Sequence, residues 1–98
     1  MKITPTKVRI EFQQFNVEAQ RPYDERLNEK EIVTESLSDI PHVGDYIGFL
    51  KEEDGQKGCF KVKTRNLTFN KKDGEWQIYA NVVLEEITSD EFDKTIKL

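Results

Sequence analysis

Residues 59–85 read CFKVKTRNLTFNKKDGEWQIYANVVLE, and this run carries the strongest fold signal in the chain. Two strand-like segments in it are separated by a short polar stretch that contains Asp73-Gly74. This dipeptide is typical of a two-residue hairpin loop, since both central residues of a type I′ turn need positive φ. The sequence therefore predicts a long β-hairpin with three pairs of facing residues near its turn: Lys72 with Glu75, Phe69 with Ile78, and Leu67 with Ala80.

The apolar residues of this hairpin do not follow one unbroken register. Alternate positions from Trp76 to Leu84 are apolar, so we expect them, Trp76 included, to face the core. In simple register, however, Val62 on the first strand would point to solvent. One extra residue at Arg65-Asn66 corrects this, because a one-residue slip moves every side chain to the other face. We therefore predict a β-bulge there, of the kind that bends a strand at the corner of a small barrel, with Thr64 opposite Val82 and Val62 opposite Leu84.

The chain before the hairpin also reads mainly as strands. Residues 6–13 alternate, with Val8, Ile10 and Phe12 on one side, which predicts a half-buried strand. The alternation then slips, and either a bulge near Gln13-Gln14 or the end of the strand explains the slip. Residues 21–24 are expected to form a turn or an extended loop. Residues 29–37 are interpreted as a short second strand, with a surface excursion or one or two helical turns as alternatives.

Turn and cap signals define the remaining elements. Proline fixes φ and glycine permits positive φ, so residues 41–45, PHVGD, predict a tight reversal. A strand from Tyr46 to Leu50 and a polar loop over residues 51–58 follow it. Near the end of the chain, Thr88 and Glu91 have capping-box spacing, which predicts a short terminal helix. A continued strand and a frayed end are the alternatives.

Residues 43–47, VGDYI, followed by residues 55–58, GQKG, resemble the Gly-Asp strand opening and Lys-Gly turn of KOW-type barrels of ribosome and transcription factors. The order of elements is similar to that of SH3-like small barrels, and the Pro-x-x-Gly-Asp pattern resembles one in small uncharacterised bacterial proteins. The resemblance implies a small five-stranded SH3-like barrel. With the chain length and the terminal helix signal, we expect one mainly β domain over residues 1–98 with a short C-terminal helix. An OB-like barrel is the rival topology.

Composition limits the classes of function. The 98 residues suit one domain, and the net charge of -4 disfavours a dedicated duplex-DNA binder, which draws most of its affinity from neutralising phosphates. Cys59 is the only cysteine and His42 the only histidine, so no disulfide can form within the chain and we expect no metal site. No signal-peptide core or apolar run of about 18 residues is present, so a cytoplasmic location without membrane contact is expected.

A basic strand face is the candidate binding site. Alternation places Lys61, Lys63 and Arg65 on one face of the first hairpin strand, and Tyr79 on the neighbouring strand is expected to share that face. Small barrels use a basic strand face with an aromatic residue to bind single-stranded nucleic acid. An ordinary solvated face, on which lysines deter edge-to-edge pairing, explains the same pattern.

No catalytic constellation is evident. Cys59 and His42 are the only classical nucleophile and base, and no third orienting group or oxyanion site accompanies them. We therefore expect neither an enzyme nor a cofactor. The favoured hypothesis is a non-enzymatic interaction module that binds a protein partner or itself, through strand edges and charged patches. The alternative is an accessory domain that binds single-stranded nucleic acid through the basic strand face.

Overall fold

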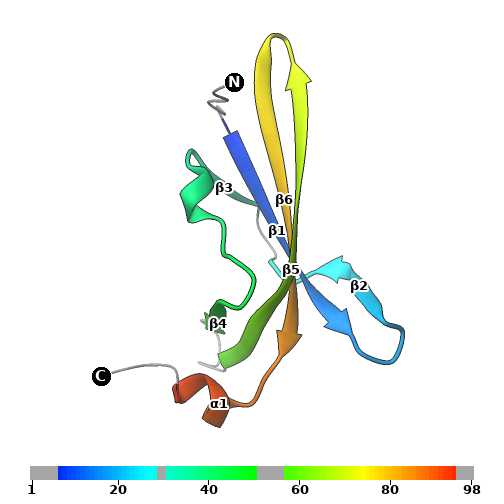
Figure 1. Cartoon of the computed structure of the whole chain (residues 1–98), viewed down its shortest axis with the longest axis vertical. Helices are drawn as coiled ribbons and strands as arrows, with labels where there is room; N and C mark the ends of the chain where they lie inside the picture. Colours follow the sequence, from blue (N-terminus) through cyan, green and yellow to red (C-terminus); the bar gives the residue numbers. More distant parts are fainter. Residues whose placement is uncertain (1–6, 29–30, 51–56, 95–98) are drawn as a thin grey trace.

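The computed structural model describes residues 7–28, 31–50 and 57–94 (Figure 1). In the described residues six strands form one mixed sheet in the order β2-β1-β6-β5-β4, and β3 pairs with β1 as well. The strands are β1 (Lys7–Asn16), β2 (Arg21–Arg26), β3 (Ile32–Thr34), β4 (Tyr46–Leu50), β5 (Lys57–Lys72) and β6 (Glu75–Glu86). A short 3-10 helix, η1 (Leu37–Asp39), and a C-terminal helix, α1 (Ser89–Asp93), complete the fold. The predictions of a mainly β chain and a terminal helix are confirmed, although the sheet has six strands instead of the five expected.

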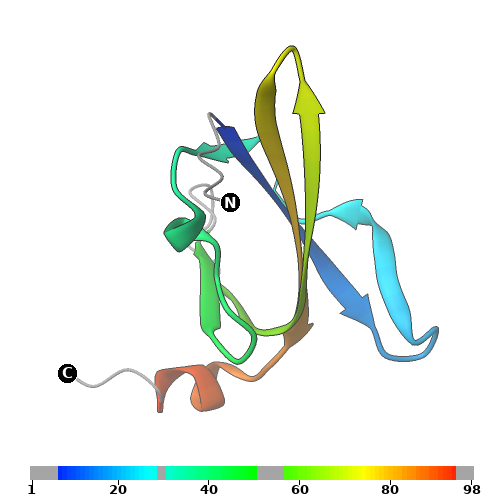
Figure 2. The same ribbon diagram turned by 45° about the horizontal axis from the view of Figure 1, so that its top comes forward.

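The sheet curls into a half-barrel (Figures 1 and 2). β1 and β6 run parallel, whereas the other neighbouring strands are antiparallel. In the described residues β2 and β4 end the sheet on opposite sides and do not pair with each other, so these strands do not close a barrel. The helix α1 begins as predicted, since the Thr88 hydroxyl accepts a hydrogen bond of 3.1 Å from the Glu91 amide.

The predicted hairpin is formed by β5 and β6. Asp73 and Gly74 have φ of 52° and 81°, as a type I′ turn requires. The three predicted pairs are all present: Lys72 with Glu75, Phe69 with Ile78, and Leu67 with Ala80. The upper part of this hairpin extends beyond the other strands, with its turn at the top of Figure 1.

The β5 bulge exists, but two residues earlier than predicted. The ladder runs unbroken through Arg65 and Asn66, and the register shifts between Val62 and Thr64, so Lys63 is the extra residue. Val62 lies opposite Leu84 as expected, whereas Thr64 lies opposite Val83 and not opposite Val82. Val62 also exchanges backbone hydrogen bonds of 2.8 and 3.0 Å with residues 44–45, which hold it beside the start of β4. β5 therefore bends immediately after Val62.

The N-terminal strands differ more from expectation. β1 continues to Asn16, and its register with β6 is unbroken up to Gln14. A register shift does occur between Gln13 and Phe15, but against β2, and the additional residues belong to β2. Residues 21–24, expected as a turn or loop, begin β2; the expected second strand is present in shortened form as β3. β2 is an exposed edge strand, so it can contain a proline and needs no alternation of apolar residues. The sequence therefore carries no signal for a strand there.

The core fills the concave side of the half-barrel. Even-numbered residues of β1 and β6, together with Phe60 and Val62 of β5, form this inner face, and Ile40 covers it from the segment between η1 and β4. Phe49 of β4 contacts both Phe12 and Phe60 edge to face, with ring centroids 5.3 and 5.8 Å apart. Figure 2 shows β3, η1 and β4 on one side of the three long strands, so the other side of those strands is the outer face of the sheet.

The reversal before β4 is confirmed. The Asp45 amide donates to the His42 carbonyl at 3.0 Å, and Gly44 between them has φ of 94°. A carboxylate oxygen of Asp45 accepts from the His42 amide at 2.8 Å, which closes the turn from the other side. The loop predicted over residues 51–58 lies largely outside the described residues, and its last two residues belong to β5.

Candidate functional site

The structure does not gather the four predicted binding residues into one cluster. Lys61 lies on the outer face of β5, where it pairs with Tyr46 of β4 and Glu85 of β6. Its Nζ is 5.6 Å from the centroid of the Tyr46 ring, within the range of a cation–π contact. The carboxylate on the opposite strand offsets the lysine charge, so this position is not strongly basic.

Lys63 occupies the bulge and reaches across the outer face. Its Nζ is 4.5 Å from the centroid of the Phe15 ring on β1, so the two side chains meet across β6, which lies between their strands. Val83 of β6 points to this face, and yet only 3% of it is exposed. The aliphatic stem of a lysine can cover apolar surface while its charged end stays in solvent, so the Lys63–Phe15 contact across β6 is positioned to shield Val83.

Arg65 is the exception to the expected basic face. The bulge at Lys63 reverses the alternation, so Arg65 points to the inner face, opposite Val82. One terminal nitrogen of its guanidinium donates to His42 Nδ1 at 2.8 Å and lies 3.5 Å from the Pro41 carbonyl oxygen. Arg65 therefore ties the segment before β4 to β5. It does not share a surface with Lys61 and Lys63.

Tyr79 does lie on the outer face, but farther along the hairpin than the two lysines. It is opposite Thr68 on β5 and Arg9 on β1. The residue is 40% exposed, and its ring lies beneath the Arg9 guanidinium, whose central carbon is 5.7 Å from the ring centroid. Arg9 is held from the other side by an ion pair of 2.9 Å between its Nε and Glu31.

The outer face of the β5–β6 hairpin carries an uncharged surface that the sequence reasoning did not detect. Four successive cross-strand pairs on this face contain no charged residue, although 35% of the chain is charged. We call these eight residues the neutral face; they are Thr64–Val83, Asn66–Asn81, Thr68–Tyr79 and Asn70–Gln77. The signal was present as uncharged residues at every second position of both strands. The predicted register already contains Thr68–Tyr79 and Asn70–Gln77, whereas Asn66–Asn81 and Thr64–Val83 can be recognised only with the bulge correctly placed.

Charged residues border the neutral face along β1. Lys7, Arg9 and Glu11 lie opposite Gln77, Tyr79 and Asn81, in that order. A shallow hollow of about 270 Å³ crosses this border, and its lining includes Arg9, Glu11, Glu31, Thr68 and Tyr79. The surface thus combines one exposed aromatic ring, one arginine, and amide or hydroxyl groups that can each donate and accept hydrogen bonds.

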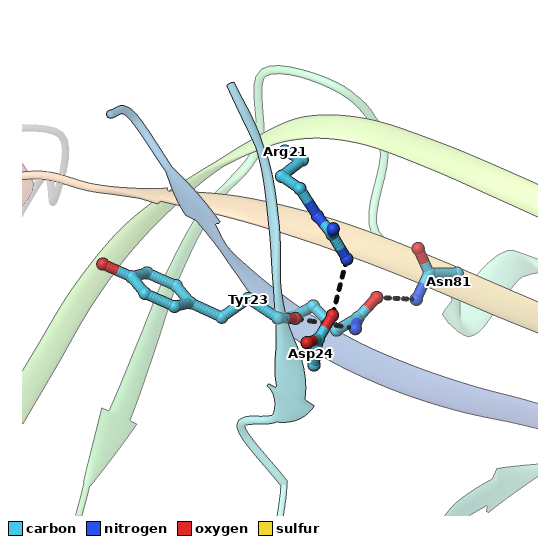
Figure 3. Close-up of polar contacts among 5 residues, drawn as sticks. Arg21, Tyr23, Asp24 and Asn81 are labelled. Carbon is cyan, nitrogen blue, oxygen red and sulfur yellow. Dashed lines mark hydrogen bonds and ion pairs between the residues drawn. The ribbon is translucent and has the colours of Figure 1, made fainter. Parts of the chain in front are cut away.

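A side-chain amide fixes the adjoining end of this surface. Gln13 of β1 accepts a hydrogen bond of 2.7 Å from Asn81 and donates one of 2.9 Å to the Tyr23 carbonyl (dashed lines in Figure 3). The second bond holds β2 against β1 at the irregular part of their ladder. An ion pair of 2.6 Å between Arg21 and Asp24 lies within β2 (Figure 3). Asn81 is therefore held in one orientation on the neutral face.

Cys59 and His42 are placed in different surroundings. Cys59 is 4% exposed and lies in β5 opposite Gly48, whereas His42 is exposed and accepts from Arg65. In the described part of the chain, no hydrogen bond joins their side chains. The arrangement gives the thiol no visible activating partner.

No family model matches the chain, and searches of curated proteins and of solved structures return no match. Within the residues that the structure describes, no helix is both long enough and apolar enough to span a membrane. The case for a function therefore depends on the chemistry of the surface itself.

Proposed function

We propose that this protein is a non-enzymatic interaction module that binds a protein partner, or a second copy of itself, through the neutral face. The observation that carries the proposal is the absence of charge on four successive outer-face pairs in a chain in which 35% of the residues are charged. Lysine and glutamate are normally found on solvated surfaces, so a run of exposed positions without them is unusual in a chain of this composition.

The composition of the neutral face is that of an interface centre. Protein interfaces are depleted in lysine, glutamate and aspartate at their centre and enriched in tyrosine and arginine. Tyr79 lies within the neutral face, and Arg9 lies against its ring at the border with β1, so both enriched residue types are present, and such residues dominate binding energies. The amides of Asn66, Asn81 and Gln77 provide directional hydrogen bonds around this pair.

An exposed strand edge adjoins the same surface. In the described residues, β4 pairs with β5 only as far as Lys61, so β5 from Thr64 onward is hydrogen-bonded to β6 alone. A partner strand added to such an edge would bring its own side chains beside Thr68 and Asn66. The resemblance to SH3-like barrels in the sequence is compatible with this proposal, since barrels of this kind can add a partner's strand to an open edge.

The test is a pull-down from lysate of the source cell with the tagged chain, split into nuclease-treated and untreated halves. We expect a protein, or the untagged chain itself, to remain bound after nuclease treatment. Asn66→Glu places a charge on the neutral face at an exposed position, and we expect this variant to lose the bound protein. Val17→Glu adds the same charge at a position that is 68% exposed in the β1–β2 turn, and should bind as the wild type does. Equal capture by Asn66→Glu and wild type would refute the proposal.

Single-stranded nucleic acid is the second candidate ligand. It is favoured by Lys61 and Lys63, each of which lies against an aromatic ring on the outer face. Glu85 opposite Lys61 and the inward position of Arg65 weaken it, since binding to a phosphate backbone depends on concentrated positive charge. Capture that disappears with nuclease and is reduced by Lys61→Glu/Lys63→Glu would replace the first proposal with this one.

A further inference from the structure

The net charge of the chain and the absence of charge on the neutral face bear on which partner this face can bind. The chain carries a net charge of -4, so two copies repel each other over most orientations. The neutral face is a region where two copies can meet without opposing like charges. Its amides and hydroxyls are both donors and acceptors, so the face can satisfy the hydrogen bonds of an identical face.

The border of the neutral face adds a pair of opposite charges with defined spacing. Arg9 and Glu11 both point outward from β1, two residues apart, and lie opposite Tyr79 and Asn81 of β6. Residues two apart on a strand are separated by about 6.5 Å. Arg9 and Tyr79 form one row across the strands, and Glu11 and Asn81 form the next row. Consider two copies packed face to face about a two-fold axis that lies between them, perpendicular to the strands and midway between these rows. This axis places each row of one copy against the other row of the second copy. Arg9 then faces the partner subunit's Glu11, and Tyr79 faces the partner subunit's Asn81.

From this complementarity we propose that the occupant of the neutral face is a second copy of this chain, packed face to face about that two-fold axis. The inference rests on the proposed function and names its partner. Each interface of this kind contains the Arg9–Glu11 pairing twice, as isologous contacts do. The intrachain ion pair between Arg9 and Glu31 uses Nε, and a guanidinium has five N–H donors, so Arg9 can serve both carboxylates.

The experiment is sedimentation velocity of the purified full-length chain over a range of concentrations at low ionic strength. We expect a monomer–dimer equilibrium in the wild type. Arg9→Glu sets a carboxylate against the partner subunit's Glu11, and Glu11→Arg sets a guanidinium against the partner subunit's Arg9. Each variant alone should therefore weaken dimerisation at least about tenfold, because like charges then meet at both copies of the contact. An equimolar mixture of the two variants should restore the dimer as a heterodimer, because each contact again joins opposite charges.

Val17→Glu is the matched control for a change of charge away from the face, and it should dimerise as the wild type does. Circular dichroism of each variant confirms that the chain is folded. A wild type that stays monomeric up to about 1 mM would overturn the inference, and so would a dimer that persists in both single variants. A monomeric wild type that still captures another protein, with that capture lost in Asn66→Glu, would overturn this inference alone and leave the proposed function standing.

Discussion

Arg65 shows how one residue can change its role when the register moves. Sequence periodicity grouped it with Lys61 and Lys63 as a surface cation, whereas the bulge at Lys63 turns it to the inner face. There its guanidinium donates to His42 Nδ1, a contact that requires this nitrogen to be unprotonated. The residue is thus part of the packing between β5 and the segment that leads into β4.

Replacing Arg65 should therefore reduce stability and leave surface binding unchanged. Arg65→Met keeps an aliphatic stem but removes the donor, and we expect it to lower the free energy of unfolding by about 1 kcal/mol. Lys61→Met is the matched control, since Lys61 is on the outer face, and it should change stability by less than about 0.5 kcal/mol. Urea unfolding followed by Trp76 fluorescence measures both. Equal effects of the two substitutions would contradict the placement of Arg65.

The bulge in β5 has a structural role at the scale of the strand. It allows Phe60 and Val62 to face the core before it and Leu67 to face the core after it, although these positions differ in parity. Deleting Lys63 removes the extra residue, so one of the two halves of β5 must turn its apolar side chains to solvent. We expect the deletion variant to lose cooperative unfolding, as measured by urea titration with far-UV circular dichroism.

Lys63→Ala separates the effect of the extra residue in β5 from the effect of the lysine side chain. It keeps the bulge residue and removes the lysine side chain with its contact to the Phe15 ring, which should cost less than about 1 kcal/mol. If deletion and substitution had similarly small effects, β5 would be able to repack in another register. The assigned alternation of its faces, and with it the neutral face, would then be wrong.

The elements that the sequence predicted well are those specified by local chemistry. Asp73-Gly74 and Gly44 adopt the positive φ that their turns require, and the hairpin register follows from the first of these. The position of the bulge was not predictable from alternation, because one extra residue at several positions between Val62 and Leu67 restores the same core. It was set by backbone hydrogen bonds of Val62 to a segment distant in sequence.

β2 and the candidate site were missed for a related reason. An edge strand with a proline and few apolar residues gives no periodic signal, and its pairing depends on tertiary contacts such as those of Gln13. The neutral face is defined by the absence of charged residues on the outer face of β5 and β6. Its full extent therefore depends on the register between these two strands. The predicted basic site assumed that Lys61, Lys63 and Arg65 share one face of β5 because they are two residues apart. The bulge at Lys63 reverses the alternation of side chains, so Arg65 lies on the other face.

At the scale of the whole molecule, one aromatic group connects the two ends of the curl. Phe49 lies between Phe12 of β1 and Phe60 of β5, and it comes from the last strand of the sheet. In the described residues β4 is hydrogen-bonded to β5 alone, so it is held over the core by the packing of Ile47 and, with two aromatic contacts, of Phe49. Local opening of the half-barrel should therefore begin at β4 and be controlled by this side chain.

Cys59 reports such an opening, because it is 4% exposed and lies opposite Gly48 of β4. We expect its reaction with a thiol reagent to be slow in the folded wild type. Phe49→Ala should accelerate labelling by about tenfold or more, since loss of a packed aromatic ring weakens the closed state. Phe69→Ala is the control: Phe69 is 45% exposed and lies near the turn of the hairpin, so the labelling rate should not change. Rapid, stoichiometric labelling of the wild type by iodoacetamide near pH 6 would contradict this protection and point to an activated thiol, because such a reaction requires the thiolate.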